Sequence, residues 1–71
     1  MVEIGRVYKH TKSGKLYKII ALAKDADTLD DIVVYEALYE NPVSKVWVRP
    51  LVFFVGTTCW NGQQIQRFSK V

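Results

Sequence analysis

The sequence predicts an all-β fold, a small SH3-like, partly open barrel of five to six strands with a short helical turn after Pro50. Its apolar segments are short and rich in Val, Ile, Tyr and Trp. Turn-forming residues separate these segments at the spacing of about 8–12 residues that is typical of β-barrels and sandwiches. Barrel closure would remove the exposed edges that short sheets carry. An OB-like barrel or a simple curled meander is the alternative.

Composition indicates one folded domain over residues 1–71. The hydrophobic content of 49% and the aromatic content of 13% are too high for a disordered chain. A core of this size supplies only about 3–5 kcal/mol of stability, so formation of a homodimer would be a further source. With a single cysteine, Cys59, and a single histidine, His10, the chain can form neither an internal disulfide nor a four-ligand zinc site.

Targeting signals are not apparent in the sequence. The amino-terminal residues contain no apolar run, and no stretch approaches the roughly 20 apolar residues of a membrane span. We therefore expect a cytoplasmic protein with no membrane contact, no metal and no cofactor.

The first predicted hairpin joins "GRVYKH" to "KLYKIIALAK" through "TKSG". Gly14 can supply the left-handed residue that such a loop needs. If His10 faces Lys15, then Tyr8 faces Tyr17 across the strands, an aromatic pair that stabilises a sheet. The following "DADTLDD" is predicted to be a polar connector, in which Thr28 and Asp31 could cap one helical turn.

The strongest strand signal is "IVVYEALY" at 32–39, followed by a turn at 40–45 and a second strand, "VWVRP". A helical turn after Pro50 would let Leu51 and Phe54 point the same way. In "TTCW-NG-QQIQRF" the Asn-Gly pair favours a type I′ turn. The resulting register places Trp60 opposite Gln63 and Thr58 opposite Ile65, with Cys59 towards solvent.

The hairpin of 32–39 with 46–49 can pair in two registers, and a slip of one residue turns every side chain over. The preferred register sets Glu36 opposite Arg49 and Leu38 opposite Trp47. Trp47 and Arg49 then lie on the outer face, and the core face holds Val33, Tyr35, Ala37, Tyr39, Val46 and Val48. In the slipped register Trp47 and Arg49 join Tyr35, Ala37 and Tyr39 on one face.

The favoured function is a non-enzymatic module that binds a peptide or protein. Small barrels hold extended ligands in aromatic grooves rimmed with charge, and Trp and Arg often dominate interface energetics. The candidate binding residues are Tyr35, Tyr39, Trp47, Arg49 and Arg67. The competing interpretation is structural, with Trp47 covering one end of the barrel and Arg49 paired to Glu36.

Single-stranded nucleic-acid binding is the alternative, because basic patches with aromatic platforms bind single strands. Its candidate residues on the first hairpin are Tyr8, Lys9, Lys12, Lys15, Tyr17 and Lys18. Charge is segregated: residues 1–24 carry six cations and one anion, whereas residues 25–40 carry six anions and no cation. The acidic segment would repel phosphates if it lay nearby.

An enzyme or enzyme accessory is a distant alternative. Catalysis by Cys59 and His10 would require the two to meet across the fold with a third group to orient the imidazole. The carboxylates of 25–36 partly echo a calcium loop, but Asp30 occupies its obligatory glycine position. A solvated acidic loop is the default interpretation of that segment.

Residues 5–68 resemble a bacterial family of small proteins, domain of unknown function 1653. The resemblance rests on "VVYEALY" followed by "WVRP", an Asn-Gly turn and a closing "QRF". It implies a small β domain without an established activity. Relatives often have His and Ser where this chain has Asp25 and Ala26. The positions it matches are Tyr8, His10, Tyr17, Thr28, Tyr35, Tyr39, Trp47, Arg49, Pro50, Phe54, Gly62, Arg67 and Phe68.

Overall fold

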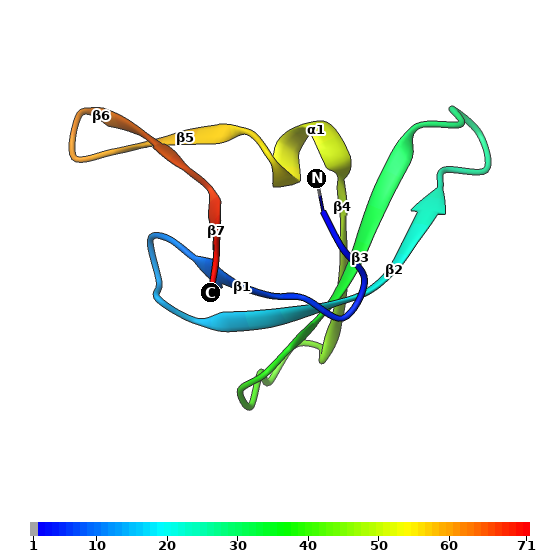
Figure 1. The fold of residues 1–71 in the computed structure, drawn as a ribbon, viewed down its shortest axis with the longest axis horizontal. Helices are drawn as coiled ribbons and strands as arrows, with labels where there is room; N and C mark the ends of the chain where they lie inside the picture. The colour runs from blue at the N-terminus through cyan, green and yellow to red at the C-terminus, as the bar shows by residue number, and fades with distance from the viewer. Residues whose placement is uncertain (1) are drawn as a thin grey trace.

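The computed structural model describes residues 2–71, which form seven strands and one short helix (Figure 1). In chain order the elements are β1 (Val7–His10), β2 (Leu16–Lys24), β3 (Asp31–Ala37), β4 (Val46–Pro50), α1 (Leu51–Phe54), β5 (Thr57–Trp60), β6 (Gln63–Gln66) and β7 (Phe68–Lys70). A five-stranded sheet has the order β4-β3-β2-β1-β7, and β5 pairs with β6. The paired strands are all antiparallel.

The larger sheet curls without closing, because β4 and β7 at its two edges are not paired to each other. The prediction of a mostly-β, partly open barrel with a short helix is therefore confirmed, with seven strands in place of five or six. The more specific SH3-like comparison stays a prediction. No helix within residues 2–71 is long and apolar enough to cross a membrane.

The core lies on the concave face of the curled sheet and under α1. Phe54 stacks on Phe68 with ring centroids 4.1 Å apart and an interplanar angle of 9°. Leu51 packs against the same core, so the helical turn after Pro50 and its shared face with Phe54 are confirmed. The buried cluster consists of Val2, Tyr8, Ile19, Val33, Tyr35, Phe54 and Phe68.

The first hairpin has the predicted register, with Tyr8 opposite Tyr17. The His10 amide donates to the Lys15 carbonyl over 2.8 Å, and Gly14 has a φ of 73°. Further along β2 the pairing with β3 shifts between Ile19 and Ala21, which is a β-bulge. A bulge bends its strand and increases the local twist, and so it contributes to the curl of the sheet.

The preferred register of the β3–β4 hairpin is wrong. Tyr35 lies opposite Trp47 and Val33 opposite Arg49, so both β4 side chains share the face of Tyr35, as in the slipped alternative. The expected Glu36–Arg49 pairing is therefore absent. Val46 and Val48, which were expected in the core, are 46% and 65% exposed. The pairing itself lies three residues from the preferred one, with Glu36 opposite Val46.

The loop between β3 and β4 explains this difference. Strand β3 ends at Ala37, whose amide donates to the Lys45 carbonyl over 2.7 Å. Leu38 and Tyr39 therefore belong to the loop, which is longer than expected and holds itself together. The Asn41 side chain accepts from the Val43 amide, and the Trp47 Nε1–H donates to the Ser44 carbonyl. Tyr39, expected on the core face, is half-buried outside the ladder.

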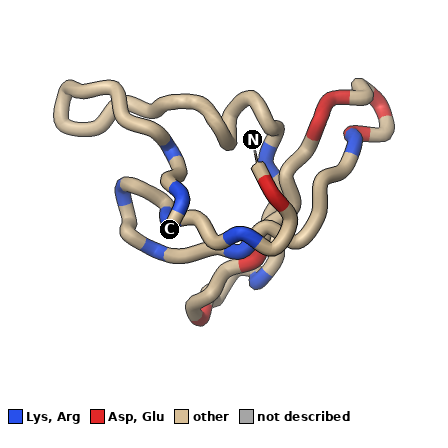
Figure 2. The backbone as a smooth tube through the Cα atoms, viewed as in Figure 1, with Lys and Arg blue, Asp and Glu red and all other residues tan. Residues whose placement is uncertain are grey.

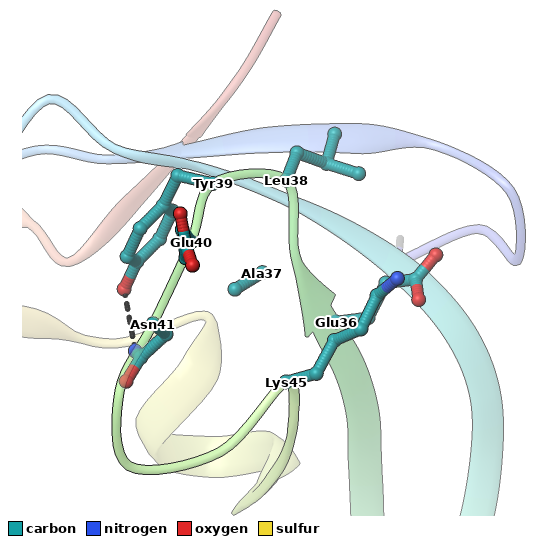
Figure 3. Close-up of a pocket in the computed structure, with 7 residues that line it drawn as sticks. All are labelled: Glu36, Ala37, Leu38, Tyr39, Glu40, Asn41 and Lys45. Atoms are coloured by element: carbon teal, nitrogen blue, oxygen red, sulfur yellow. Dashed lines mark hydrogen bonds between the residues drawn. The ribbon is translucent and has the colours of Figure 1, made fainter.

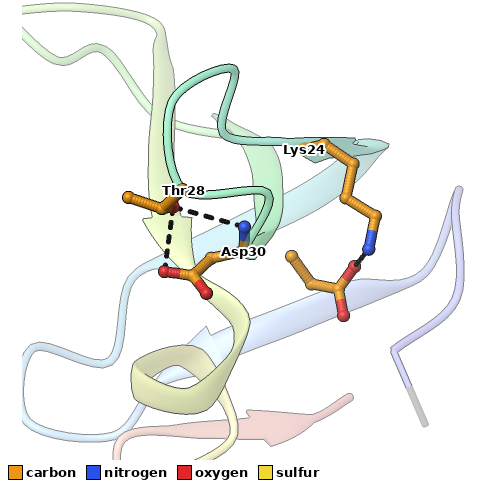
Figure 4. Close-up of polar contacts among 4 residues, drawn as sticks. Lys24, Thr28 and Asp30 are labelled. Carbon is orange, nitrogen blue, oxygen red and sulfur yellow. Dashed lines mark hydrogen bonds and ion pairs between the residues drawn. The ribbon is translucent and has the colours of Figure 1, made fainter.

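The acidic connector between β2 and β3 is a loop, as expected, but its cap is wrong. Asp25, not Thr28, accepts the amide protons of Asp27 and Thr28, over 2.8 and 3.1 Å. Thr28 Oγ1 instead donates to Asp30 (Figure 4). The side chains of Asp25 and Asp30 thus accept hydrogen bonds from within the loop and stabilise its turn. No group of residues within 2–71 is arranged to hold a metal ion.

The β5–β6 hairpin confirms its prediction in full. Asn61 and Gly62 both have positive φ, 53° and 75°, as a type I′ turn requires. Trp60 lies opposite Gln63, and Thr58 opposite Ile65.

Cys59 is exposed on this hairpin, as the register predicted. Because the thiol reaches solvent, we expect one equivalent of a thiol reagent to react with the native protein without denaturant. Storage without reductant is expected to give a disulfide-linked dimer on a non-reducing gel. A Cys59→Ser variant should show neither effect. A thiol that reacts only after denaturation would contradict the exposure.

Candidate functional site

Three tyrosines form a connected cluster at the end of the sheet where β3 leaves the ladder. The Tyr17 and Tyr39 hydroxyls are hydrogen-bonded over 2.6 Å, and Asn41 Nδ2 donates to the Tyr39 hydroxyl over 2.9 Å. The Tyr35 ring stands edge-on to Tyr17 with centroids 5.2 Å apart. Lys15 Nζ lies 4.4 Å from the Tyr39 ring centroid, a cation–π contact.

The pKa of Tyr17 is raised well above its ordinary value of 10.0, first by burial and then by the hydrogen bond with Tyr39. Burial likewise raises the pKa of Tyr8. In the unfolded chain these phenols ionise near pH 10. The folded state resists this ionisation. The stability that the two neutral phenols contribute is therefore fully present below about pH 10 and is lost as pH rises above that value.

We therefore expect the free energy of unfolding in denaturant to begin to fall as pH rises past about 10 and to keep falling at higher pH. A Tyr17→Phe variant is expected to be less stable than the parent at neutral pH, since the bond to Tyr39 is lost. Its stability should also decline less steeply with alkali, because one ionising group is gone. An equal decline in both proteins would contradict the role of Tyr17.

Arg49 on β4 borders the tyrosine cluster. Its Nε donates to the Tyr35 hydroxyl over 3.4 Å, and its Cζ lies 5.7 Å from the centroid of the Phe68 ring. Phe54 stacks on Phe68 from within the core. Arg49 is half-buried, and among residues 2–71 it forms no ion pair with a carboxylate. We call Tyr17, Tyr39 and Arg49, together with Tyr35, which is buried beneath them at 4% exposure, the tyrosine–arginine surface.

His10, at the end of β1, lies beside this surface. Its ring stands edge-on to Phe68 with centroids 5.2 Å apart, and Nδ1 lies 3.0 Å from Ser13 Oγ. Burial lowers the pKa of His10 below its ordinary 6.5, and the positive charges of Arg49, Arg67 and Lys12 lower it further. The imidazole is therefore neutral at neutral pH.

A hollow of about 450 Å³ adjoins Tyr39 at the loop between β3 and β4 (Figure 3). Glu36, Glu40 and Lys45 carry charge of both signs around it, and Asn41 donates to the Tyr39 hydroxyl along one side of it. The remaining lining residues are Ala37, Leu38 and Tyr39. A mixed-charge hollow beside an aromatic cluster is suited to polar and apolar groups of one extended chain.

The structure brings together three of the five candidate binding residues, Tyr35, Tyr39 and Arg49. Trp47 shares their face but packs half-buried against the core, with its indole N–H satisfied by Ser44. Arg67 precedes β7, and its Nε donates to the Phe53 carbonyl over 3.2 Å. Its charge nonetheless acts on His10.

Sequence reasoning missed His10, Phe68 and Asn41 as parts of this site, and it assigned Tyr17 only to the nucleic-acid alternative. Phe68 reaches the site because β7 pairs with β1, opposite His10. That pairing brings the first and last strands of the chain side by side, and no local sequence pattern predicts it. The adjacency of His10, Ser13 and Lys15 around the first turn was the one local signal available.

The nucleic-acid residues of the first hairpin do not form one surface. Side chains alternate along a strand, so Lys9 and Lys18 leave the face opposite to Tyr8 and Tyr17. Tyr8 is buried in the core, where no base could stack on it. The acidic loop between β2 and β3 lies at the other end of the molecule from the turn that carries Lys12 and Lys15 (Figure 2). Glu36, from the same acidic segment, nevertheless lies opposite Lys18 in the ladder, so the expected repulsion is only partly removed.

The fold and the site define a small, mostly-β domain with an aromatic and basic surface. The chain belongs to the family described as "Protein of unknown function (DUF1653)", whose model matches residues 6–70. A solved structure, that of a DUF1653 protein from the bacterium Bordetella bronchiseptica, is similar with a TM-score of 0.84 and 30% identity. The match covers 99% of this chain and 87% of that one. No curated protein matches the chain.

Proposed function

We propose that this protein is a non-enzymatic binding module that recognises a peptide or protein through the tyrosine–arginine surface. The observation that carries the proposal is the half-buried residue Arg49, whose guanidinium has no acidic partner within residues 2–71. Charged groups withdrawn from water are usually paired, since desolvation is costly. A ligand group would supply the missing partner.

The chemistry of the residues around Arg49 supports recognition of a ligand rather than catalysis. Tyr17 resists ionisation, and His10 has Arg49 beside it in place of a carboxylate that would orient it as a base. Cys59, the candidate nucleophile, lies on the separate β5–β6 hairpin. Trp47 supports the surface from within the core, and Arg67 adds positive charge at its border.

The test is a titration of the isotope-labelled protein with a library of short extended peptides, followed by NMR. Binding at this surface is expected to shift the signals of Tyr35, Tyr39 and Arg49 while those of the acidic loop stay in place. Tyr39→Ala is expected to weaken binding, whereas Val43→Ala, in the same loop but 79% exposed and outside the lining of the hollow, is the matched control. Peptides that shift none of these signals would count against the proposal.

Single-stranded nucleic acid is the second candidate, favoured by the separation of the basic hairpin from the acidic loop (Figure 2). Binding of an oligothymidylate that weakens steeply as salt is raised would support it. Among single substitutions, Lys12→Gln and Lys15→Gln should cause the largest loss of affinity for the oligothymidylate. Absence of binding at low salt would remove this candidate.

We also propose a cytoplasmic location, which an unpaired, exposed cysteine supports, because reducing compartments keep such thiols free. A Cys59 that is found oxidised in freshly lysed cells would contradict it.

A further inference from the structure

The hydrogen-bond donors beside Phe68 outnumber their acceptors. Arg49 uses Nε for Tyr35, while both of its terminal Nη groups form no hydrogen bond or ion pair with residues 2–71. A guanidinium offers five N–H groups in a planar fork and no acceptor. The free Nη groups of this half-buried residue therefore present donors to whatever lies over this part of the surface.

His10 adds a donor to the same place. The Ser13 amide donates to Nδ1 over 3.4 Å, and the Ser13 hydroxyl lies 3.0 Å from the same nitrogen. Because Nδ1 accepts, the proton of the neutral ring is on Nε2, which has no hydrogen-bond partner within residues 2–71. Arg49 and His10 both contact the Phe68 ring, so their donors lie around one aromatic side chain.

Positive charge surrounds this pair of donors. Arg49 on β4, Lys12 in the first turn and Arg67 before β7 all act on His10, and no carboxylate acts on it. None of these cations forms an ion pair within residues 2–71. An acceptor-only, negatively charged group is the chemical complement of such a place.

We propose that Arg49 and His10, seated against Phe68, bind a carboxylate group of an extended peptide. This inference rests on the proposed function and names the ligand group that the tyrosine–arginine surface selects. The free Nη groups of Arg49 match the two oxygens of one carboxylate. Arg67, whose Nε donates to the Phe53 carbonyl, adds positive charge beside His10. We commit to a peptide carboxylate because the adjoining hollow is lined by Glu36 and Glu40 as well as Lys45, a mixed charge that suits a peptide better than a polyanion.

The carboxylate can come from an acidic side chain or from the end of a chain, and the experiment separates the two. Each peptide of a short library is made in three versions: Glu with an amidated end, Gln with a free end, and Gln with an amidated end. One of the carboxylate versions is expected to bind roughly 10- to 100-fold more tightly than the neutral version, since hydrogen bonds to charged groups are strong. Which of the two binds identifies the source.

His10 provides a direct readout, because it is the only histidine in the chain and gives one pair of imidazole signals. A bound carboxylate favours the protonated ring, so the pKa of His10 is expected to rise on saturation with the tight-binding peptide. By linkage, that peptide should bind more tightly as pH falls through the pKa of His10. The neutral version should leave this pKa in place.

Arg49→Lys retains the charge and removes the fork. We expect it to lose about tenfold in affinity for the carboxylate peptide and little for the neutral one. Arg6→Lys is the matched control, since Arg6 is exposed and faces Glu3 at 4.0 Å. The His10 readout in the unaltered protein decides the matter if Arg49→Lys fails to fold.

The outcomes separate the two proposals. Equal affinity for all three versions, with shifts at Tyr35 and Tyr39, would overturn the carboxylate subsite and leave the binding module intact. Binding of none of the versions would overturn both. A pKa of His10 that rises with an oligothymidylate and not with the peptides would overturn the inference in favour of a phosphate ligand.

Discussion

Replacing Phe54 by Ala is expected to unfold the protein at room temperature. The ring is 1% exposed, stacks on Phe68 at 4.1 Å and lies 5.4 Å from both Tyr8 and Tyr35. Its loss removes the centre of the core and leaves a cavity that the curled sheet cannot fill. Such Phe→Ala changes cost about 3–5 kcal/mol, which equals the roughly 3–5 kcal/mol that a core of this size supplies.

The matched control lies one residue earlier in the same helical turn. Phe53 is 58% exposed, and its contribution to the site is the backbone carbonyl that Arg67 contacts. Phe53→Ala should change the free energy of unfolding by no more than about 0.5 kcal/mol. Circular dichroism and denaturant titration of the two variants provide the measurement. A cooperative transition of Phe54→Ala near that of the parent would contradict the assignment of the core.

The parts of the fold that short-range chemistry determines could be predicted from the sequence. Asn61 and Gly62 need positive φ, and that need alone specified the β5–β6 turn and its register. Pro50 ended the ladder and began a helical turn for a similarly local reason. The resemblance to the family rested on the same segments, and the family match confirms it.

The register of β3 with β4 could not be predicted, because its loop is long and both faces of β4 are apolar. Val46 and Val48 offer one hydrophobic face, and Trp47 offers another. Tertiary packing places the Trp47 face towards the core, because the large ring fills space there, while the valines stay exposed. Pairing of opposite charges, which had favoured Glu36 with Arg49, contributes little at a surface and was the weaker guide.

The candidate site was predictable only where it lies on one hairpin. Tyr35, Tyr39 and Arg49 come from neighbouring segments of the chain and were found by pattern. Phe68, against which Arg49 and His10 both rest, is brought there by the pairing of β7 with β1. Residues far apart in sequence meet through that pairing, so the donors of His10 and Arg49 could not be joined by reasoning on local motifs.

The assignment of side chains to the two faces of the β3–β4 hairpin leads to the second prediction with a large effect on stability. Val33 is fully buried and lies directly opposite Arg49, whereas Val48 on the next strand is 65% exposed on the other face. Lys at position 33 would place a charge in the core beside a guanidinium, so Val33→Lys is expected to abolish folding. Val48→Lys puts the same side chain on the outer face of an edge strand, where lysine is well tolerated.

The pair of variants tests the register without a further structure, because the two substitutions are chemically identical and differ only in the face they occupy. Val48→Lys should keep a thermal midpoint within a few degrees of the parent, since surface substitutions stay within about 0.5 kcal/mol. Val33→Lys should show no cooperative transition. The preferred sequence register, which buried Val33 and Val48 together, would require both variants to unfold. Survival of Val48→Lys alone therefore places Trp47 and Arg49 on the concave side, where the tyrosine–arginine surface needs them.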